Sequence, residues 1–205
     1  MAIKVANNQS MTGITALPSA ISGGAWTLIS TTTASSSATL DITSGLDDTY
    51  DVYCFKYYNL HLATDGQDVL FNGSDDTSSH SYNITKTTSY FYARHDEGDS
   101  ATQLTYLTGL DLAQGTGFQP LTQALGDTAV DNDASASGYL HLFNPSSTTF
   151  VKHYIAEVQH MHNNDYSMDG FVAGYANTTS AIDAVQFKAS SGNIDAGDIC
   201  LYGIN

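Results

Sequence analysis

Residues 50–58 read Tyr-Asp-Val-Tyr-Cys-Phe-Lys-Tyr-Tyr and form the strongest strand signal in the sequence. Aromatic and β-branched side chains of this kind fit the pleated, half-buried surface of a β-strand. Bulky groups occupy both alternating faces of the run. We therefore expect a central strand that is buried on both sides.

Shorter runs of the same character continue on either side of this segment, separated by turns rich in Gly, Asn, Asp, Pro and Ser. They predict strands at 26–30, 38–43, 68–71, 90–94, 103–107, 117–122, 138–143, 148–158, 170–175, 182–189 and 199–204. Sustained helical periodicity is missing from every window of about 12 residues. Ten to twelve short strands at this spacing predict an all-β fold, an antiparallel β-sandwich that is jelly-roll-like.

The first 25 residues differ from the rest because they carry Ser, Thr, Asn and Gly with only isolated apolar positions. We expect residues 1–25 to form an extended N-terminal arm and residues 26–205 to form a single β-sandwich domain. The start of the chain turns polar too soon for a secretory signal. An arm of this length could reach roughly 80 Å, which favours a homo-oligomer with exchanged arms, a trimer above all.

The charge balance restricts the partners of the protein. Among 205 residues, 21 are acidic and 6 are basic, and the formal net charge is −15. Clustered positive charge is needed to grip nucleic-acid phosphates or an anionic membrane surface, so we expect neither partner. No apolar run approaches the roughly 20 residues that span a bilayer.

Two groups of polar residues are candidates for metal binding. His160 and His162 share one face of a predicted strand end and could ligate zinc; the alternative is a solvated loop. Asp127, Asp131 and Asp133 lie close together in the sequence, and the spacing of Asp131 and Asp133 resembles the start of a calcium loop.

The calcium loop is incomplete, because Ala136 and Leu142 stand where an EF-hand requires Gly and Glu. A looser calcium site that includes Asp96, Glu97 or Asp99 stays open, as does the alternative that these acidic loops only keep the protein soluble. No metal or other cofactor is assigned from the sequence.

Motifs of catalysis and of thiol chemistry are missing from the sequence. It contains no nucleophile elbow, no phosphate-binding Gly-rich loop and no His-Glu-x-x-His pair, so we expect a protein that is not an enzyme. Cys54 and Cys200 are interpreted as small buried hydrophobic residues. A disulfide between them is left open.

Tyrosines near predicted turns are candidates for ligand contact, because a tyrosine ring offers an apolar face and a polar end. Tyr82 and Tyr166 are the selected candidates for a ligand or partner surface, chosen from a set that also contains Tyr90, Tyr92 and Tyr175. The alternative is that most of these rings pack inside the sandwich or between subunits.

Three stretches resemble small structural proteins of tailed bacteriophages, especially marine ones, and domains attached to phage tail fibres. They are Asp48-Thr-Tyr-Asp-Val-Tyr53, Gly138-Tyr-Leu-His-Leu-Phe-Asn-Pro-Ser-Ser147 and the closing 190–204 run with Gly-Asn-Ile, Gly and Leu-Tyr-Gly-Ile. The chain departs from the usual pattern near Asp198 and Cys200. No site residues carry over from this resemblance.

The resemblance implies a virion structural protein on the particle exterior, associated with the tail, a fibre or the capsid and aiding host attachment. Its partners would be other virion proteins and a host surface glycan, and the protein would be made in the host cytoplasm. A capsid decoration or cement protein that stabilises the shell is the first alternative. A carbohydrate-binding module is the second.

Overall fold

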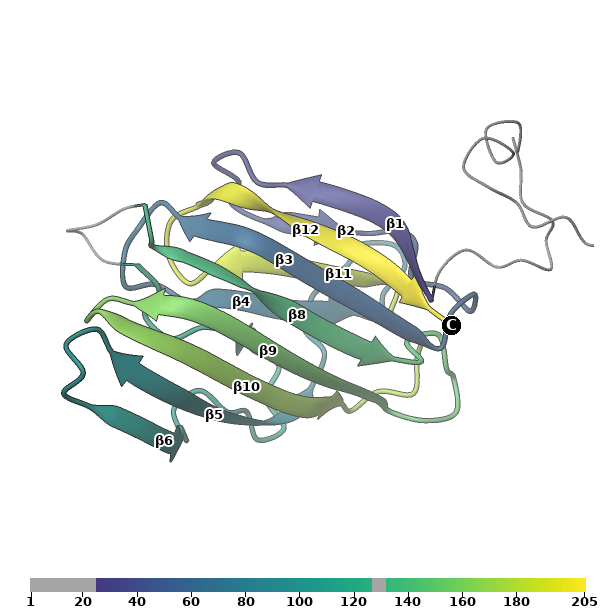
Figure 1. Cartoon of the computed structure of the whole chain (residues 1–205). Coiled ribbons are helices and arrows are strands. Elements are labelled where there is room, and N and C mark those ends of the chain that lie inside the picture. The colour runs from purple at the N-terminus through teal and green to yellow at the C-terminus, as the bar shows by residue number, and fades with distance from the viewer. Residues whose placement is uncertain (1–24, 127–131) are drawn as a thin grey trace, which may run out of the picture.

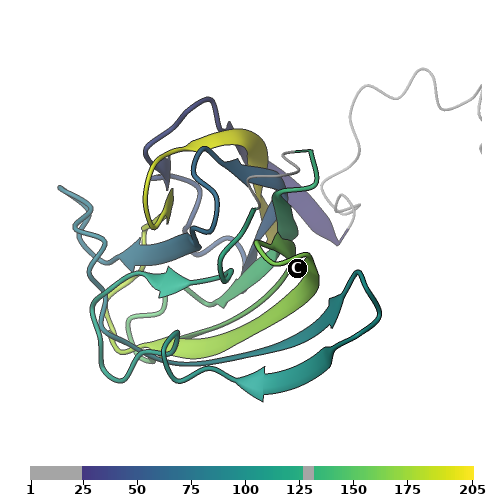
Figure 2. The same cartoon turned by 90° about the vertical axis from the view of Figure 1, so that its left-hand side faces the viewer.

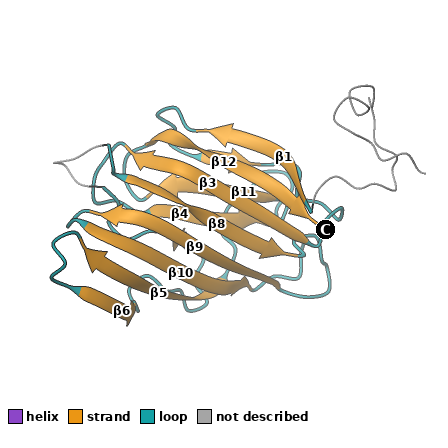
Figure 3. Cartoon of the chain, viewed as in Figure 1, coloured by secondary structure: helices purple, strands orange, loops and turns teal. Residues whose placement is uncertain are grey.

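The computed structural model describes residues 25–126 and 132–205, which form twelve β-strands and no helix (Figure 3). The strands make two antiparallel sheets, and the prediction of an all-β sandwich is confirmed. Apart from Ala25, the predicted N-terminal arm lies outside the described residues. Within them, no helical segment is long and apolar enough to cross a membrane.

The two sheets differ in width (Figure 1). In spatial order, the large sheet contains β1 (Trp26–Thr33), β12 (Ile194–Ile204), β3 (Val52–Leu62), β8 (Ser135–Phe143), β9 (Lys152–His162), β10 (Tyr166–Ala176), β5 (Lys86–Asp96) and β6 (Thr102–Tyr106). The small sheet contains β2 (Leu40–Ile42), β11 (Ala184–Ala189), β4 (Val69–Ser74) and β7 (Gln119–Pro120). Figure 2 shows them as two layers.

The chain passes from one sheet to the other at eight connections: β1–β2, β2–β3, β3–β4, β4–β5, β6–β7, β7–β8, β10–β11 and β11–β12. Between these steps, the β5–β6 and β9–β10 hairpins add four strands to the large sheet. Repeated crossing between two sheets is what a jelly roll requires. The jelly-roll assignment itself stays a prediction.

The core lies between the sheets and is centred on Phe187 of β11, which is fully buried. Its ring centre lies 5.6 Å from that of Phe55 and 6.0 Å from that of Tyr57, both on β3. Phe71 of β4 completes the cluster at 6.3 Å. One aromatic cluster therefore joins strands from both layers.

β3 is central in the large sheet, as predicted, but the expectation of burial on both sides is wrong in part. Tyr53, Phe55 and Tyr57 are buried against the core, whereas Tyr58 on the opposite face is 43% exposed. The outer face of the large sheet has no second layer over it among the described residues. Its aromatic side chains therefore meet solvent.

β9 runs from Lys152 to His162, four residues later in the sequence than predicted. The side-chain oxygen of Ser147 accepts hydrogen bonds from the backbone N–H groups of Thr149 and Phe150, both at 3.2 Å. This turn removes the two amides from any strand ladder. The strand consequently begins after the turn and includes the histidines that follow.

Candidate binding surface on the outer face of the large sheet

The strand register aligns one outward-facing residue from each strand of the large sheet. Opposite pairs connect these residues across all eight strands. We call this line the outer row: Thr31, Cys200, Lys56, Tyr139, Glu157, Phe171, Phe91 and Tyr106. It brings together side chains from segments that lie far apart in the sequence.

Near one end of the outer row, Trp26 lies beside Lys56 and is 41% exposed. The ring centre of Trp26 lies 5.8 Å from that of Tyr202 and 5.9 Å from that of His141. The Lys56 ammonium lies 4.5 Å from the Trp26 ring centre, a cation–π distance. Burial and the nearby Lys56 charge lower the pKa of His141. These contacts hold the tryptophan ring against the sheet.

The other end is built on Phe91 and Phe171, whose rings stack with centres 4.8 Å apart and planes 10° from parallel. Phe91 is 40% exposed. Both rings line a shallow depression of about 220 Å³, together with Tyr139, Ile155 and Glu157. This part of the surface presents aromatic faces to solvent.

A phenol–carboxylate pair lies in the same depression. The hydroxyl of Tyr139 donates a 2.5 Å hydrogen bond to Glu157 Oε2, and this bond, with burial, raises the pKa of Tyr139 to about 12. Burial and the charge of Glu157 raise the pKa of neighbouring Asp169. Aromatic faces beside carboxylate acceptors can stack on the apolar face of a sugar and accept hydrogen bonds from its hydroxyls.

Positive charge on the described residues is sparse and lies on buried or half-buried side chains. Lys86 and Lys152 are buried. Lys56, Arg94 and Lys188 lie over the rings of Trp26, Tyr166 and Phe118, at 4.5, 4.2 and 4.1 Å from the ring centres. Exposed charge on the described residues therefore comes mainly from carboxylates, which favours neutral or cationic ligands over anionic ones.

His160 and His162 lie on the same face of β9, but that face is the buried one. His160 Nε2 lies 3.0 Å from the carbonyl oxygen of Gln123, and His162 Nδ1 accepts a hydrogen bond from the N–H of Asn164. Across residues 25–126 and 132–205, no three His, Cys, Asp or Glu side chains could hold a metal ion. The zinc hypothesis finds no support in this geometry. The solvated-loop alternative is wrong for the two histidines, although Asn163, Asn164 and Asp165, which follow them, are exposed.

Burial gives His160 a predictable effect on acid stability. It lowers the pKa of the imidazole to about 4, whereas in the unfolded chain the pKa is about 6.5. Between these values the unfolded chain binds a proton that the folded chain does not bind. The free energy of unfolding should therefore fall by roughly 3 kcal/mol as the pH drops from 6.5 to 4.

Denaturant titrations at several pH values test this expectation. In His160→Gln, the fall in stability over this pH range should be smaller than in the wild type. His95→Gln is the matched control, because the His95 side chain is 52% exposed. Equal pH profiles for the wild type and His160→Gln would contradict the assignment.

The acidic candidates are only partly described. Asp127 and Asp131 lie outside the described residues, and Asp133 is exposed. Asp96 closes the β5–β6 turn: its carboxylate accepts hydrogen bonds from the Ser100 hydroxyl and from the N–H groups of Ala101 and Ser100, which lower its pKa. The Asp96 carboxylate already accepts these hydrogen bonds within the turn. A calcium site would therefore depend on the other acidic residues of the two loops, and it stays a prediction.

The selected tyrosines contact neighbours within the protein. Tyr82 is half-buried, and this burial, with the hydrogen bond to Asp41, raises its pKa. Tyr166 is half-buried beneath the Arg94 guanidinium. Of the rest of the set, Tyr90 and Tyr92 are buried and Tyr175 packs against His153. Trp26, Phe91 and Phe171 are not among the residues predicted to bind a ligand, although each lies in a predicted strand, where alternation places every second side chain on the outer face.

Cys54 and Cys200 are both free. They lie on adjacent strands, but Cys54 is opposite Tyr202 and Cys200 is opposite Lys56. Diagonal neighbours of this kind are about 7–8 Å apart, beyond the usual Cα distance of a disulfide. Burial raises the pKa of Cys54 to about 12, which makes its thiol unreactive at neutral pH.

A second hollow lies near the start of β8 and is mostly polar. It is lined by Asn59, His61, Asn132, Ser135, Asp195 and Ala196. His61 Nδ1 lies 2.7 Å from Asp195 Oδ1. The hollow has no aromatic lining apart from the imidazole, so the outer row is the better candidate for binding.

Comparison of the chain with protein-family models found no matching family. Comparison with curated proteins and with solved structures also found no match.

Proposed function

We propose that the protein is a structural component of the exterior of a tailed-bacteriophage particle, and that the outer row binds a saccharide on the host surface. The observation that carries the binding role is the exposed Phe91–Phe171 stack beside the Tyr139–Glu157 pair. Aromatic faces and a hydrogen-bonding carboxylate meet there, and the neighbouring cation of the outer row, Lys56, lies over the Trp26 ring. The resemblance to phage structural proteins supports the location.

The sandwich suits this role for physical reasons. Binding residues that project from a hydrogen-bonded sheet are held more firmly than residues on loops. The excess of acidic residues and the partial burial of the basic ones leave an anionic exterior, which packaged DNA would repel. Both features favour an outward-facing protein that binds and does not transform its ligand.

Binding to an array of bacterial surface polysaccharides tests the proposal. We expect the wild-type protein to bind a subset of neutral glycans. Phe171→Ala should weaken that binding at least about tenfold, because it removes one ring of the stack. Glu157→Gln should weaken it less, because one hydrogen-bond acceptor oxygen remains.

Phe150→Ala is the matched control, because Phe150 is 72% exposed in the turn before β9 and lies outside the outer row. It should bind glycans as the wild type does. Failure of the wild type to bind any glycan would contradict the saccharide role, as would unchanged binding in a folded Phe171→Ala variant.

A decoration or cement protein is the second candidate, favoured by exposed apolar side chains beside the outer row. Leu104 is 73% exposed and Ile155 is 44% exposed, and such residues could be buried against coat subunits. Copy number in purified particles separates the two roles. One copy for each coat subunit indicates decoration, and a few copies for each tail indicate attachment.

A further inference from the structure

We propose that Lys86 and Asn72 form an intramolecular isopeptide bond that joins the two sheets covalently. Asn72 lies on β4 of the small sheet, and Lys86 is the first residue of β5 in the large sheet. Lys86 Nζ lies 2.5 Å from Asn72 Oδ1, and both residues are almost completely buried. The two side chains that would react are therefore already in contact.

The carboxamide of Asn72 is held in one orientation. Its Oδ1 accepts a 2.9 Å hydrogen bond from the N–H of Gly73, and its Nδ2 donates to the carbonyl oxygens of Tyr82 (2.6 Å) and Thr116 (3.0 Å). The hydrogen bond from the Gly73 N–H polarises the side-chain carbonyl of Asn72. With a C=O bond of about 1.23 Å, the carboxamide carbon lies at most about 3.7 Å from Nζ, close to a near-attack distance.

The environment of Lys86 favours a neutral amine, which is the nucleophilic form. The side chain borders a small, mainly apolar cavity lined also by Phe71, Ile84 and Leu140. Burial lowers the pKa of Lys86 to about 7. Among the described residues, no carboxylate lies within ion-pair distance of its amine. A large fraction of the amine is consequently unprotonated at neutral pH.

The bond can form without any co-reactant. Lys86 Nζ adds to the carboxamide carbon of Asn72, and the Gly73 N–H stabilises the charge that develops on Oδ1. A proton moves from Nζ to Nδ2, the bond between the carbon and Nδ2 breaks, and ammonia leaves. One carbon–nitrogen bond forms as another breaks, so oxidation states do not change.

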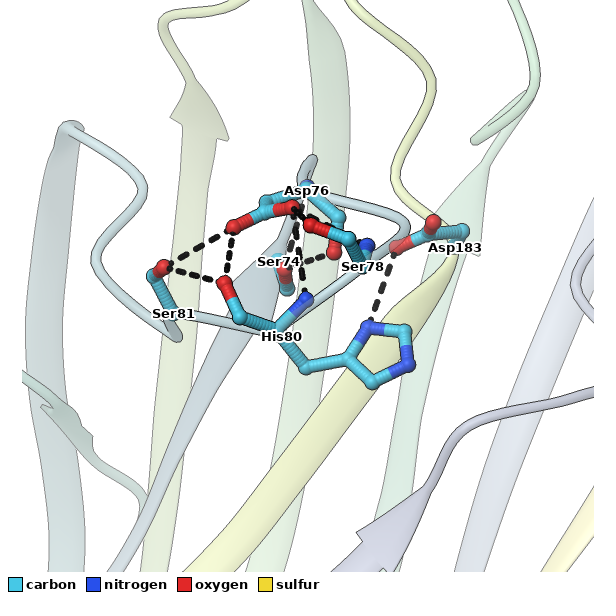
Figure 4. A network of polar contacts seen from close by, with 7 residues as sticks. Ser74, Asp76, Ser78, His80, Ser81 and Asp183 are labelled. Carbon is cyan, nitrogen blue, oxygen red and sulfur yellow. Dashed lines mark hydrogen bonds and ion pairs between the residues drawn. The ribbon is translucent and has the colours of Figure 1, made fainter.

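The loop that connects the two residues is internally braced, as Figure 4 shows. Asp76 accepts hydrogen bonds from the N–H of Ser78 (3.0 Å) and the hydroxyl of Ser81 (3.1 Å). His80 Nδ1 lies 3.6 Å from Asp183 Oδ1, beside the small sheet. A braced loop limits the motion of Lys86 relative to Asn72, which raises their effective concentration.

Mass spectrometry of the full chain under denaturing conditions tests the proposal. After incubation at pH 8, the wild-type mass should be lower than the sequence mass by one ammonia molecule. A digest should contain one branched peptide that joins the segments around Asn72 and Lys86. Lys86→Met and Asn72→Ala should show their full masses, and Phe150→Ala should show the same loss as the wild type.

A wild-type protein of full sequence mass overturns the proposal, whether or not the variants fold. Asn72 precedes Gly73, and cyclisation of an Asn-Gly pair to a succinimide also releases ammonia. Loss of ammonia that persists in Lys86→Met, without a branched peptide, indicates this cyclisation and equally overturns the isopeptide bond.

Discussion

Replacing Phe187 with alanine should lower the free energy of unfolding by about 3–5 kcal/mol. The ring is fully buried and packs against Phe55, Tyr57 and Phe71, so its removal leaves a cavity between the two sheets. Because the sheets face each other across this ring, neighbouring side chains cannot collapse into the space without shifting a strand. Chemical denaturation followed by circular dichroism measures the change.

Phe150→Ala removes the same ring from an exposed position and should change stability by less than about 0.5 kcal/mol. Similar losses of unfolding free energy in Phe187→Ala and Phe150→Ala would contradict the position of Phe187 at the centre of the core. Phe187→Leu should lie between the two values, because it keeps most of the buried volume.

Gly138→Ala should destabilise the protein by about 3 kcal/mol or more, although it adds a single methyl group. A Cβ at this position would lie 2.2 Å from the carbonyl oxygen of Glu157 and 2.8 Å from Cα of Val158, both in the backbone of β9. Neither atom can move without separating β8 from β9 in the middle of the large sheet. Overpacking of this kind strains the backbone and is not relieved by a change of rotamer.

Gly109→Ala is the matched control, because a Cβ there would have no heavy atom within 4 Å. Thermal and urea denaturation of both variants compare the two effects. A Gly138→Ala protein with wild-type stability would show that β8 and β9 lie farther apart than described.

Local sequence pattern was enough to predict most of the strands. The alternation of Tyr53, Phe55 and Tyr57 places β3 correctly, because period-two burial is a property of the strand itself. The start of β9 was predicted four residues too early. The β-branched and aromatic residues before Lys152 favour a strand, but the Ser147 side chain binds their amides in a turn. A hydrogen bond made by one side chain outweighed the propensity of several residues.

The candidate surface could not be predicted because it depends on register between distant strands. Phe91 and Phe171 each lie in a predicted strand, but their stacking requires β5 and β10 to pair with these two residues opposite each other. Irregularities along β12 and β3 shift the register further. A shift of one residue would turn Phe171 into the core. The contact between Asn72 and Lys86 likewise depends on how the two layers stack.

The order of strands in the large sheet has a consequence for biosynthesis. β1 is at the edge of that sheet, and among the described strands its only hydrogen-bonded neighbour there is β12, with Trp26 opposite Ile204. β1, the first of the described strands to be synthesised, therefore has no partner in this sheet until β12 has been synthesised. β3 also lacks its β12 neighbour until that strand has been synthesised, so the large sheet cannot close before then, and its unpaired strand edges stay open to non-native pairing in the meantime.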